Sequence, residues 1–316
     1  MVASYHKVGS TMMKIKKRLL TSLLAGLAAL TLAGCANQGK QIAQQQQGHQ
    51  TTQQAQQNAN DSSKSSFGAA LPAKTYPNQN LAQTTLTPSV KAQLGADEYD
   101  YNGAGAFNLY GGHMQKLNVN VSSAPYVQQA KRNPAHGNRV EGTARAWLNR
   151  SSRQYQNRNA LGQGRGSFKP VGFHQIMGLN AKAVGYNHLY DRGHLIAYAI
   201  AGNVRGFDAS ESNANNIVTQ TAWSNEAGTY QDGTGQNYYE AQVRKALDQN
   251  QQVMYAVTPI YNTPQDLVPM GMHLQAKQKD GTVLFNVFVP NVENGFKINY
   301  QTGKAVVNNN KAFFNQ

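Results

Sequence analysis

The sequence has few charged residues, a single cysteine and no hydrophobic run long enough to form a permanent membrane-spanning helix. Only 14% of its 316 residues are charged, well below the roughly 25% of an ordinary soluble domain. Cys35 stands alone, which excludes an intrachain disulfide framework and any cysteine-based zinc cluster. The longest apolar run, Leu19 to Leu32, has about 14 residues, whereas a bilayer-spanning helix needs about 20. With 40% hydrophobic residues, however, the chain can build one sizeable core or two small ones, so it is not a fully disordered protein.

Acidic residues are the scarcer of the two charge classes. The chain has 29 Lys+Arg against 15 Asp+Glu, which gives a formal net charge of +14 and a pI near 9.7. Such an excess indicates a polyanionic partner, either a nucleic acid or an anionic surface.

The first 35 residues have the three parts of an export signal. Basic residues at 14–18 precede the apolar run, and the run ends in Leu32-Ala33-Gly34-Cys35. This ending resembles the lipobox of bacterial lipoproteins, which implies a lipid on Cys35 and attachment to the extracellular face of the cell membrane. Removing residues 1–35 takes away five cations and no acid, so 24 Lys+Arg remain against 15 Asp+Glu and the net charge stays at +9.

Residues 36–84 form a low-complexity, Gln-, Ser- and Thr-rich segment that we interpret as a tether. Between Ala36 and Ser66 there are eleven glutamines and almost no large apolar side chain. Such a segment buries too little surface to offset the entropy of ordering it. The folded domain is therefore expected at residues 85–316.

The domain is predicted to be α+β, with a mixed or antiparallel central sheet. Gln236 to Gln249 places apolar residues at the i, i+4, i+7, i+8 spacing of an amphipathic helix. The expected strands outnumber the helices and are not separated by regular crossover helices. These strands lie at Val140–Leu148, Ile217–Gln220, Val253–Thr258, Leu267–Leu274 and Thr282–Val289.

Positive charge is concentrated between Lys131 and Lys169, where nine cations face the single acid Glu141. Arginine predominates there, and aromatic residues are interleaved with it, as suits bidentate phosphate contacts and stacking on bases. Some of these arginines could instead pair with Glu141 or with backbone carbonyls. The candidate nucleic-acid contacts are Arg145, Arg150, Arg153, Arg158, Arg165 and Lys169.

The strongest chemical motif is Asp191-Arg192-Gly193-His194. It stands directly before an apolar segment, and Asn216, Asn225 and Glu240 follow downstream. On its own a four-residue string is weak evidence, because a histidine beside an apolar run is more often a satisfied core residue than a catalyst. The polar residues that follow it strengthen the functional interpretation.

From about Arg139 to Asn299 the chain resembles the DNA/RNA non-specific endonuclease family, most closely its membrane-attached DNA-entry nucleases of Gram-positive bacteria. The resemblance implies a ββα-metal (His-Me) finger active site that hydrolyses phosphodiester bonds of DNA and RNA with Mg²⁺, which Mn²⁺ could replace. It also implies that His194 is the general base and Asn225 the metal ligand. The remaining roles it implies are a glutamate that orients the hydrated metal ion, an upstream site asparagine and an arginine near the scissile phosphate, carried by Glu240, Asn216 and Arg192.

The sequence leaves some assignments open. The family has a further upstream arginine, for which Arg158 and Arg165 are both candidates. Arg244 and Lys245 share the predicted helix with Glu240, so they could extend a phosphate-binding surface or could be ordinary helix charges. Glu240 itself could form an i,i+4 surface pair with Arg244. Five histidines show no metal-ligand spacing and are expected to be structural or exposed, namely His113, His136, His174, His188 and His273.

Two other functions compete with a nuclease. A lipoprotein that binds nucleic acid without cutting it would use the basic segment equally well, but it would need no base, metal ligand and metal-orienting carboxylate. A cell-wall hydrolase would need paired catalytic carboxylates or a zinc or Cys/His site, which the sequence does not suggest. No protein partner is predicted.

Overall fold

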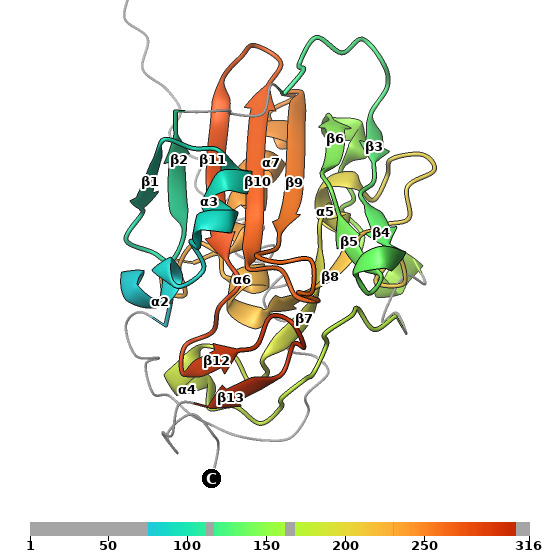
Figure 1. Ribbon diagram of the computed structural model, residues 1–316. Helices are drawn as coiled ribbons and strands as arrows, with labels where there is room; N and C mark the ends of the chain where they lie inside the picture. Colours follow the sequence, from blue (N-terminus) through green and yellow to red (C-terminus); the bar gives the residue numbers. More distant parts are fainter. Residues whose placement is uncertain (1–74, 112–116, 162–167, 230, 308–316) are drawn as a thin grey trace, which may run out of the picture. The chain divides into compact units, whose positions relative to one another are not determined.

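The computed structural model describes residues 75–111, 117–161, 168–229 and 231–307 (Figure 1). The helices are α2 (Gln79–Gln83), α3 (Pro88–Leu94), α4 (Ala181–Val184), α5 (Tyr198–Ala201), α6 (Ala222–Glu226) and α7 (Gln236–Asp248), with 3-10 turns η1 (Pro134–His136), η2 (Arg150–Ser152) and η3 (Asn159–Leu161). The strands are β1 (Glu98–Tyr101), β2 (Phe107–Tyr110), β3 (Tyr126–Gln128), β4 (Lys131–Asn133), β5 (Arg139–Glu141), β6 (Ala144–Leu148), β7 (Tyr190–His194), β8 (Ile217–Thr221), β9 (Val253–Ile260), β10 (Gly271–Gln278), β11 (Val283–Pro290), β12 (Phe296–Ile298) and β13 (Ala305–Val307).

A seven-stranded sheet forms the centre, in the order β1-β2-β11-β10-β9-β6-β3. Every neighbouring pair in it is antiparallel. The pairing of β9 with β10 runs from Val253 opposite Gln278 to Ile260 opposite Gly271. The predicted α+β class with an antiparallel central sheet is thereby confirmed.

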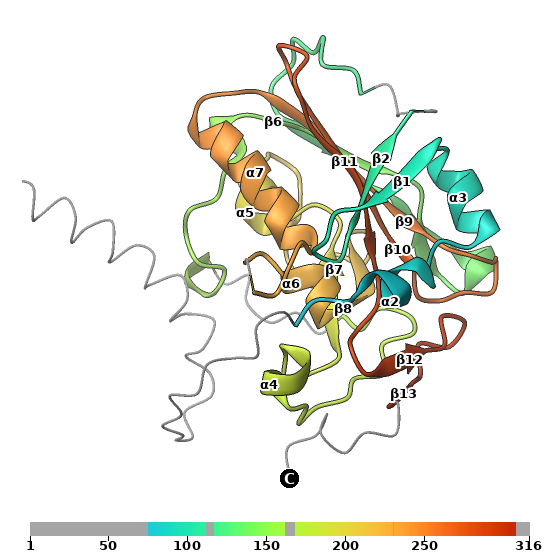
Figure 2. The same cartoon turned by 90° about the vertical axis from the view of Figure 1, so that its left-hand side faces the viewer.

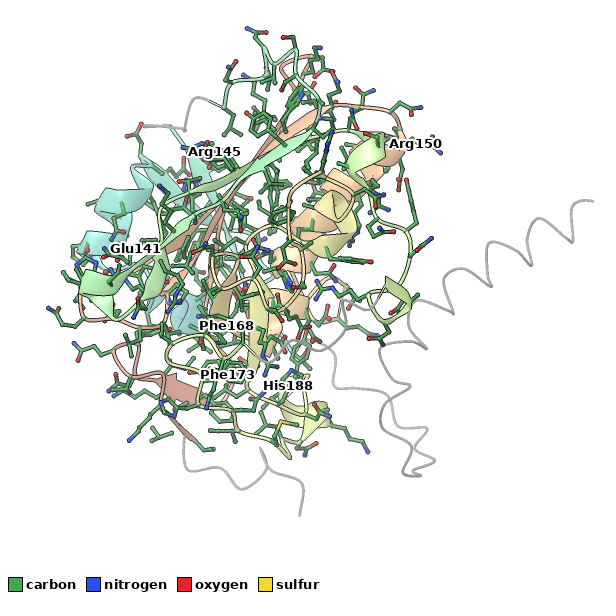
Figure 3. The ribbon with its side chains drawn as sticks, turned by 90° about the vertical axis from the view of Figure 1, so that its right-hand side faces the viewer. Glu141, Arg145, Arg150, Phe168, Phe173 and His188 are labelled. Atoms are coloured by element: carbon green, nitrogen blue, oxygen red, sulfur yellow. The ribbon has the colours of Figure 1, made fainter. Side chains whose placement is uncertain are left out.

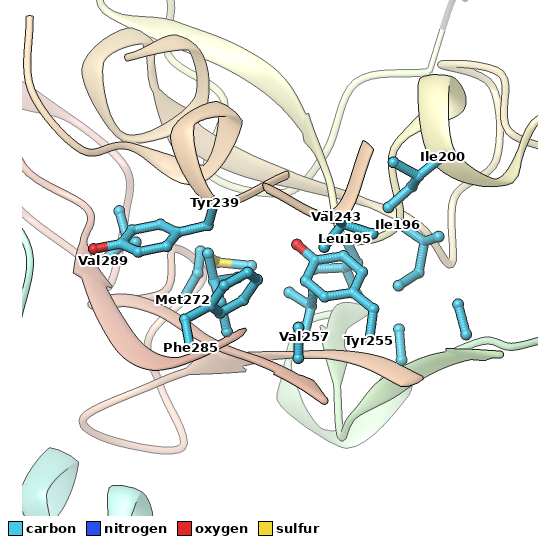
Figure 4. Close-up of a cluster of buried hydrophobic side chains, with 14 of the residues drawn as sticks. Leu195, Ile196, Ile200, Tyr239, Val243, Tyr255, Val257, Met272, Phe285 and Val289 are labelled. Carbon is cyan, nitrogen blue, oxygen red and sulfur yellow. The ribbon is translucent and has the colours of Figure 1, made fainter. Parts of the chain in front are cut away.

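Helices cover both faces of this sheet (Figure 2). On one face lies α7, whose Tyr239 and Val243 pack on Tyr255, Phe285 and other side chains of the sheet (Figure 4). On the opposite face α2 and α3 bury Ala82, Val90 and Leu94 against residues of β2 and β11. Since α2 precedes residue 85, the folded part includes residues that we had expected to belong to the tether.

Most elements expected from the sequence are present. The helix predicted at Gln236 to Gln249 is α7, and the strands expected at Ile217–Gln220, Val253–Thr258 and Thr282–Val289 correspond to β8, β9 and β11. The strand expected at Val140–Leu148 is divided into β5, which pairs with β4, and β6, which belongs to the central sheet. The strand expected at Leu267–Leu274 was placed too early, because β10 begins at Gly271. Before it, the amides of Leu267 and Val268 bond Tyr300 O, outside the sheet, and Pro269 has no amide hydrogen to donate.

The strand β7, which carries the Asp-Arg-Gly-His motif, was not predicted from the sequence. It pairs antiparallel with β8, from Tyr190 opposite Thr221 to His194 opposite Ile217. Strand β8 runs directly into α6, where the Thr221 hydroxyl caps the helix by accepting from the amide of Ser224. The unit β7–β8–α6 therefore has a ββα arrangement that brings the residues of the Asp-Arg-Gly-His motif next to Asn225.

In the described part of the chain no helix has the length and hydrophobicity needed to cross a bilayer.

Candidate active site

Strands β7 and β8 are held together closely at Gly193. A Cβ atom at this position would lie 2.1 Å from Gln220 Oε1 and 2.7 Å from Gln220 Cβ. No side chain fits in this space without moving Gln220, which is fully buried. The glycine of the motif is therefore explained by packing between the strand of His194 and its partner strand.

His194 lies at the end of β7 and is 8% exposed. Its Nε2 atom is buried and has no hydrogen-bond partner among the described residues. Burial, and next the positive charge of Arg158, lower the pKa of His194 to about 3, against hydrogen bonds with the backbone of Ala209 and Ser210. The imidazole is therefore neutral at physiological pH, which is the form that can accept a proton.

Asn216 holds the chain just after His194. Its Oδ1 accepts from the Ile196 amide at 2.9 Å and its Nδ2 donates to Ile196 O at 2.9 Å. The Asn216 carbonyl also accepts from the Leu195 amide at 2.8 Å. Both ends of the side chain therefore bind the backbone of Ile196, two residues after His194.

Asn225 is half-buried on α6 and reaches the motif through Asp191. Its Nδ2 donates to Asp191 Oδ2 at 3.0 Å. A carboxylate can only accept, so this contact fixes which end of the carboxamide is the nitrogen. Within the described residues no donor occupies Oδ1, and a neutral amide oxygen beside a carboxylate is a suitable ligand for Mg²⁺. The residues present therefore fit the predicted ion.

Two residues that the sequence reading did not assign to the site surround Asp191. His188 Nε2 lies 2.7 Å from Asp191 Oδ1, and its Nδ1 lies 2.8 Å from Asn187 Oδ1. Burial lowers the pKa of His188, but the hydrogen bond and charge of Asp191 outweigh burial and raise it. Burial, and then the charge of Asp191, raise the pKa of Glu226 to about 8. One ligand atom each from His188, Asp191 and Glu226 lies within 4.8 Å of the others; the only sequence signal was the short spacing of His188 and Asp191.

Glu240 projects from α7 into a buried polar network. Its Oε1 accepts from Gln236 Nε2 at 2.9 Å and from the Tyr255 hydroxyl at 3.4 Å. Burial raises the pKa of the Glu240 carboxyl, and the contacts with Gln236, Arg244 and Tyr255 oppose that effect. At 6% exposure it does not form the surface pair with Arg244 considered above.

Arg158 lies near both His194 and Glu240. Its charge lowers the pKa of His194 and opposes the rise that burial causes in the pKa of Glu240, and its guanidinium lies 5.0 Å from the Tyr198 ring. Glu211 binds it at 3.3 Å. Of the two candidates for the upstream arginine, Arg158 therefore has a position suited to the role, whereas Arg165 lies outside the described residues.

Arg192 follows Asp191 on β7. Its Nε donates to Phe168 O at 2.7 Å, and its guanidinium lies 5.4 Å from the Phe173 ring. Phe168, Phe173 and His188 lie in the same region of the molecule (Figure 3). These contacts hold the guanidinium of this motif residue close to Phe168 and Phe173.

The other predicted cations differ in what they contact. Arg153 is buried and forms an ion pair with Asp248 at 3.1 Å, so it is engaged within the fold. Arg244 is half-buried and donates to Asn237 Oδ1 at 2.9 Å. Arg145 lies on β6 and Arg150 in η2, and both are apart from His188 (Figure 3). Arg150, Lys169 and Lys245 are exposed, and Arg145 is half-buried.

One cavity of the described structure lies away from these residues. It has a volume of about 1090 Å³ and is lined by Tyr76, Tyr110, Tyr238 and residues of β2 and β11. None of the residues predicted for catalysis or metal binding lines it, so the chemistry is assigned from the side-chain geometry around β7 and not from cavity size.

The antiparallel sheet and the β7–β8–α6 unit, with a neutral buried histidine on β7 and an asparagine on α6 that binds Asp191 of the same strand, define a nuclease of the ββα-metal class. The family model described as DNA/RNA non-specific endonuclease matches residues 95–311. Crystal structures of NucA from Streptococcus agalactiae, with no metal and with magnesium bound, are 42% identical and match 73% of this chain and 97% of theirs, with TM-scores of 0.59 and 0.60. The chain belongs to the DNA/RNA non-specific endonuclease family and is therefore a phosphodiester hydrolase. This family assignment was predicted from the sequence and is confirmed.

Proposed function

We propose that this protein is a surface-tethered, Mg²⁺-dependent endonuclease that cleaves both DNA and RNA, with His194 as the general base and Asn225 as the metal ligand. One observation carries the proposal: the strand β7 joins a neutral, buried His194 to an Asp191 that orients Asn225. A protein that only binds nucleic acid has no use for this arrangement.

The side chains match the needs of phosphodiester hydrolysis. A water molecule must lose a proton as it attacks phosphorus, and the neutral imidazole of His194 can take that proton. The negative phosphate beside the ring would raise the pKa of His194 from its low value toward the working range. Arg158 and Arg192 supply fixed positive charge for the phosphate in the transition state.

Mg²⁺, when bound at Asn225, would supply Lewis-acid stabilisation of the phosphate and of the leaving oxygen. The magnesium-bound NucA structure supports this choice of ion. Asp191 keeps the carboxamide of Asn225 in its orientation, and Glu240 would orient the hydration shell of the ion.

The substrate would be held through its phosphates, because the exposed cations Arg150, Lys169 and Lys245 suit sequence-independent contacts. Arg145 and Arg244 are further candidates. Both DNA and RNA have this backbone, so both are expected to bind.

The N-terminal segment supports a location of the protein outside the cell membrane. The signal ending at Cys35 and the Gln-rich tether support export, lipidation of Cys35 and attachment outside the cell membrane. This is the arrangement of the membrane-attached nucleases that the sequence resembles. Mass spectrometry of the membrane fraction would test for an acylated Cys35.

The activity is tested on the chain that lacks residues 1–35, incubated with supercoiled plasmid and with RNA. We expect cleavage of both with Mg²⁺ and none with EDTA. The matched control is His194→Ala purified in the same way, which reveals contaminating nuclease. A folded wild-type protein that cuts neither substrate at any Mg²⁺ concentration would overturn the proposed function.

A further inference from the structure

Gln236 connects the predicted base to the predicted metal-orienting carboxylate. Its Nε2 donates to His194 O at 2.6 Å and to Glu240 Oε1 at 2.9 Å, with a longer contact to Leu195 O at 3.4 Å. Its Oε1 accepts from Gln220 Nε2 at 3.3 Å. The side chain is 2% exposed, so water does not substitute for these partners.

The two hydrogens on the carboxamide nitrogen make the link between β7 and Glu240 specific to a glutamine at position 236. A carboxamide nitrogen has two hydrogens, and here one is directed to the backbone of β7 and the other to Glu240. Neither a carboxylate nor an aliphatic side chain of the same size can donate twice. Both partners are pure acceptors, so replacing Gln236 would leave two buried oxygens without this donor.

The backbone around Gln236 is also tightly placed. Gly235, which precedes α7, approaches α6 so closely that a Cβ atom there would lie 2.5 Å from Trp223 O. Gln220 Nε2, besides binding Gln236, donates to Ser224 Oγ at 3.1 Å, next to Asn225. The first turn of α7 is thus fixed to α6 and β8 as well as to β7.

We propose that Gln236 is a positioning residue that fixes Glu240 relative to the strand of His194, so that the base and the carboxylate keep one geometry. This inference rests on the proposed function and adds a residue to it. Gln236 would not touch the substrate. Its loss is therefore expected to lower kcat and leave KM for DNA nearly unchanged.

A double-mutant cycle tests this role. Gln236→Leu is measured alone and in the Glu240→Ala background, with Gln242→Leu as the control, because Gln242 lies on the same helix and has no hydrogen bond to site residues in the described structure. We expect Gln236→Leu to lower kcat about 10- to 100-fold in the protein that keeps Glu240. In the Glu240→Ala variant the same change should lower kcat less than about 3-fold. An equal loss in both backgrounds, or a wild-type kcat, would overturn the proposal.

A second readout separates positioning from general destabilisation. Burial raises the pKa of Glu240, and the Gln236 bond opposes this rise together with Arg244 on the same helix, Tyr255 of β9 and Arg158. Gln236→Leu should therefore move the acidic limb of the kcat profile to higher pH, which Gln242→Leu should not do. An unmoved acidic limb counts against the proposal. Gln236→Met, which keeps the volume, serves if Gln236→Leu does not fold.

Urea unfolding of the wild type, Gln236→Leu, Glu240→Ala and the double variant tests the contact between Gln236 and Glu240 without measuring catalysis. We expect Gln236→Leu to lower the unfolding midpoint more in the Glu240 background than in the Glu240→Ala background. If the wild type does not cut DNA but this coupling is found, the proposed function fails while the Gln236–Glu240 contact stands. If the wild type is active and neither kcat nor the midpoint shows coupling, the inference about Gln236 fails.

Discussion

Asn225 Nδ2 donates to Asp191 Oδ2 at 3.0 Å, which leaves the carboxamide oxygen of Asn225 as the atom available to a metal ion. This contact joins α6 to β7. It also explains why an aspartate and an asparagine that are 34 residues apart can serve one site.

The first prediction compares Asn225→Ala with Glu240→Gln. Removing a direct ligand should raise the Mg²⁺ concentration for half-maximal activity and lower the rate more than removing an orienting charge. A Mg²⁺ titration of plasmid nicking measures both effects. If Asn225→Ala keeps the wild-type half-saturation and rate, its assignment as the ligand is wrong.

The second prediction concerns the base. His194→Ala should lower the cleavage rate about 10² or more, because a general base acts in the transition state. DNA affinity should change little, since binding depends on the cations. Single-turnover cleavage and fluorescence anisotropy measure the two quantities, and near-normal cleavage would remove His194 from the mechanism.

The third prediction is a pH dependence of stability. The unfolded chain protonates His194 near pH 6.5, but the folded chain resists protonation down to about pH 3. Stability from this group is therefore complete above pH 6.5 and is lost as the pH falls from 6.5 toward 3, by about 2 kcal/mol between pH 7 and pH 5. Urea unfolding at both pH values should show this loss in the wild type and not in His194→Gln. Equal losses in the two proteins would contradict it.

The fourth prediction separates exposed cations from engaged ones. On a His194→Ala background, changing Arg150, Lys169 or Lys245 to Ala should lower the slope of log affinity against log salt by about one unit if that residue contacts a phosphate. Arg153→Ala is the contrast, because it breaks the ion pair with Asp248 and should lower the melting temperature with little change in slope. Unchanged slopes in stable variants of all three exposed cations would place the binding surface elsewhere.

The fifth prediction tests the close packing of β7 on β8. Gly193→Ala places a methyl group against Gln220 and should destabilise the protein by about 1–3 kcal/mol. Gln220→Ala should relieve part of that cost in the double variant, although it also removes a buried hydrogen-bond donor. Full additivity in urea unfolding would show that the contact is not the cause.

The sequence by itself determined the family, the amphipathic helix α7 and most strands of the central sheet. Those inferences depend on local periodicity and on short motifs, which are properties of neighbouring residues. It also pointed to His194, Asn225 and Glu240, whose roles remain proposals.

Only the tertiary structure decided which side chains meet. Strand β7 contains a glycine and two charged residues, so its sequence shows no alternation, and its strand form depends on pairing with β8. Gln236 has no local signal of function, because its importance comes from contacts with His194 on another element. His188 is signalled in the sequence only by its short spacing from Asp191. Likewise, the sequence could not distinguish Arg153 from Arg150, since an ion pair with Asp248 forms only after α7 has packed against the loop that carries Arg153.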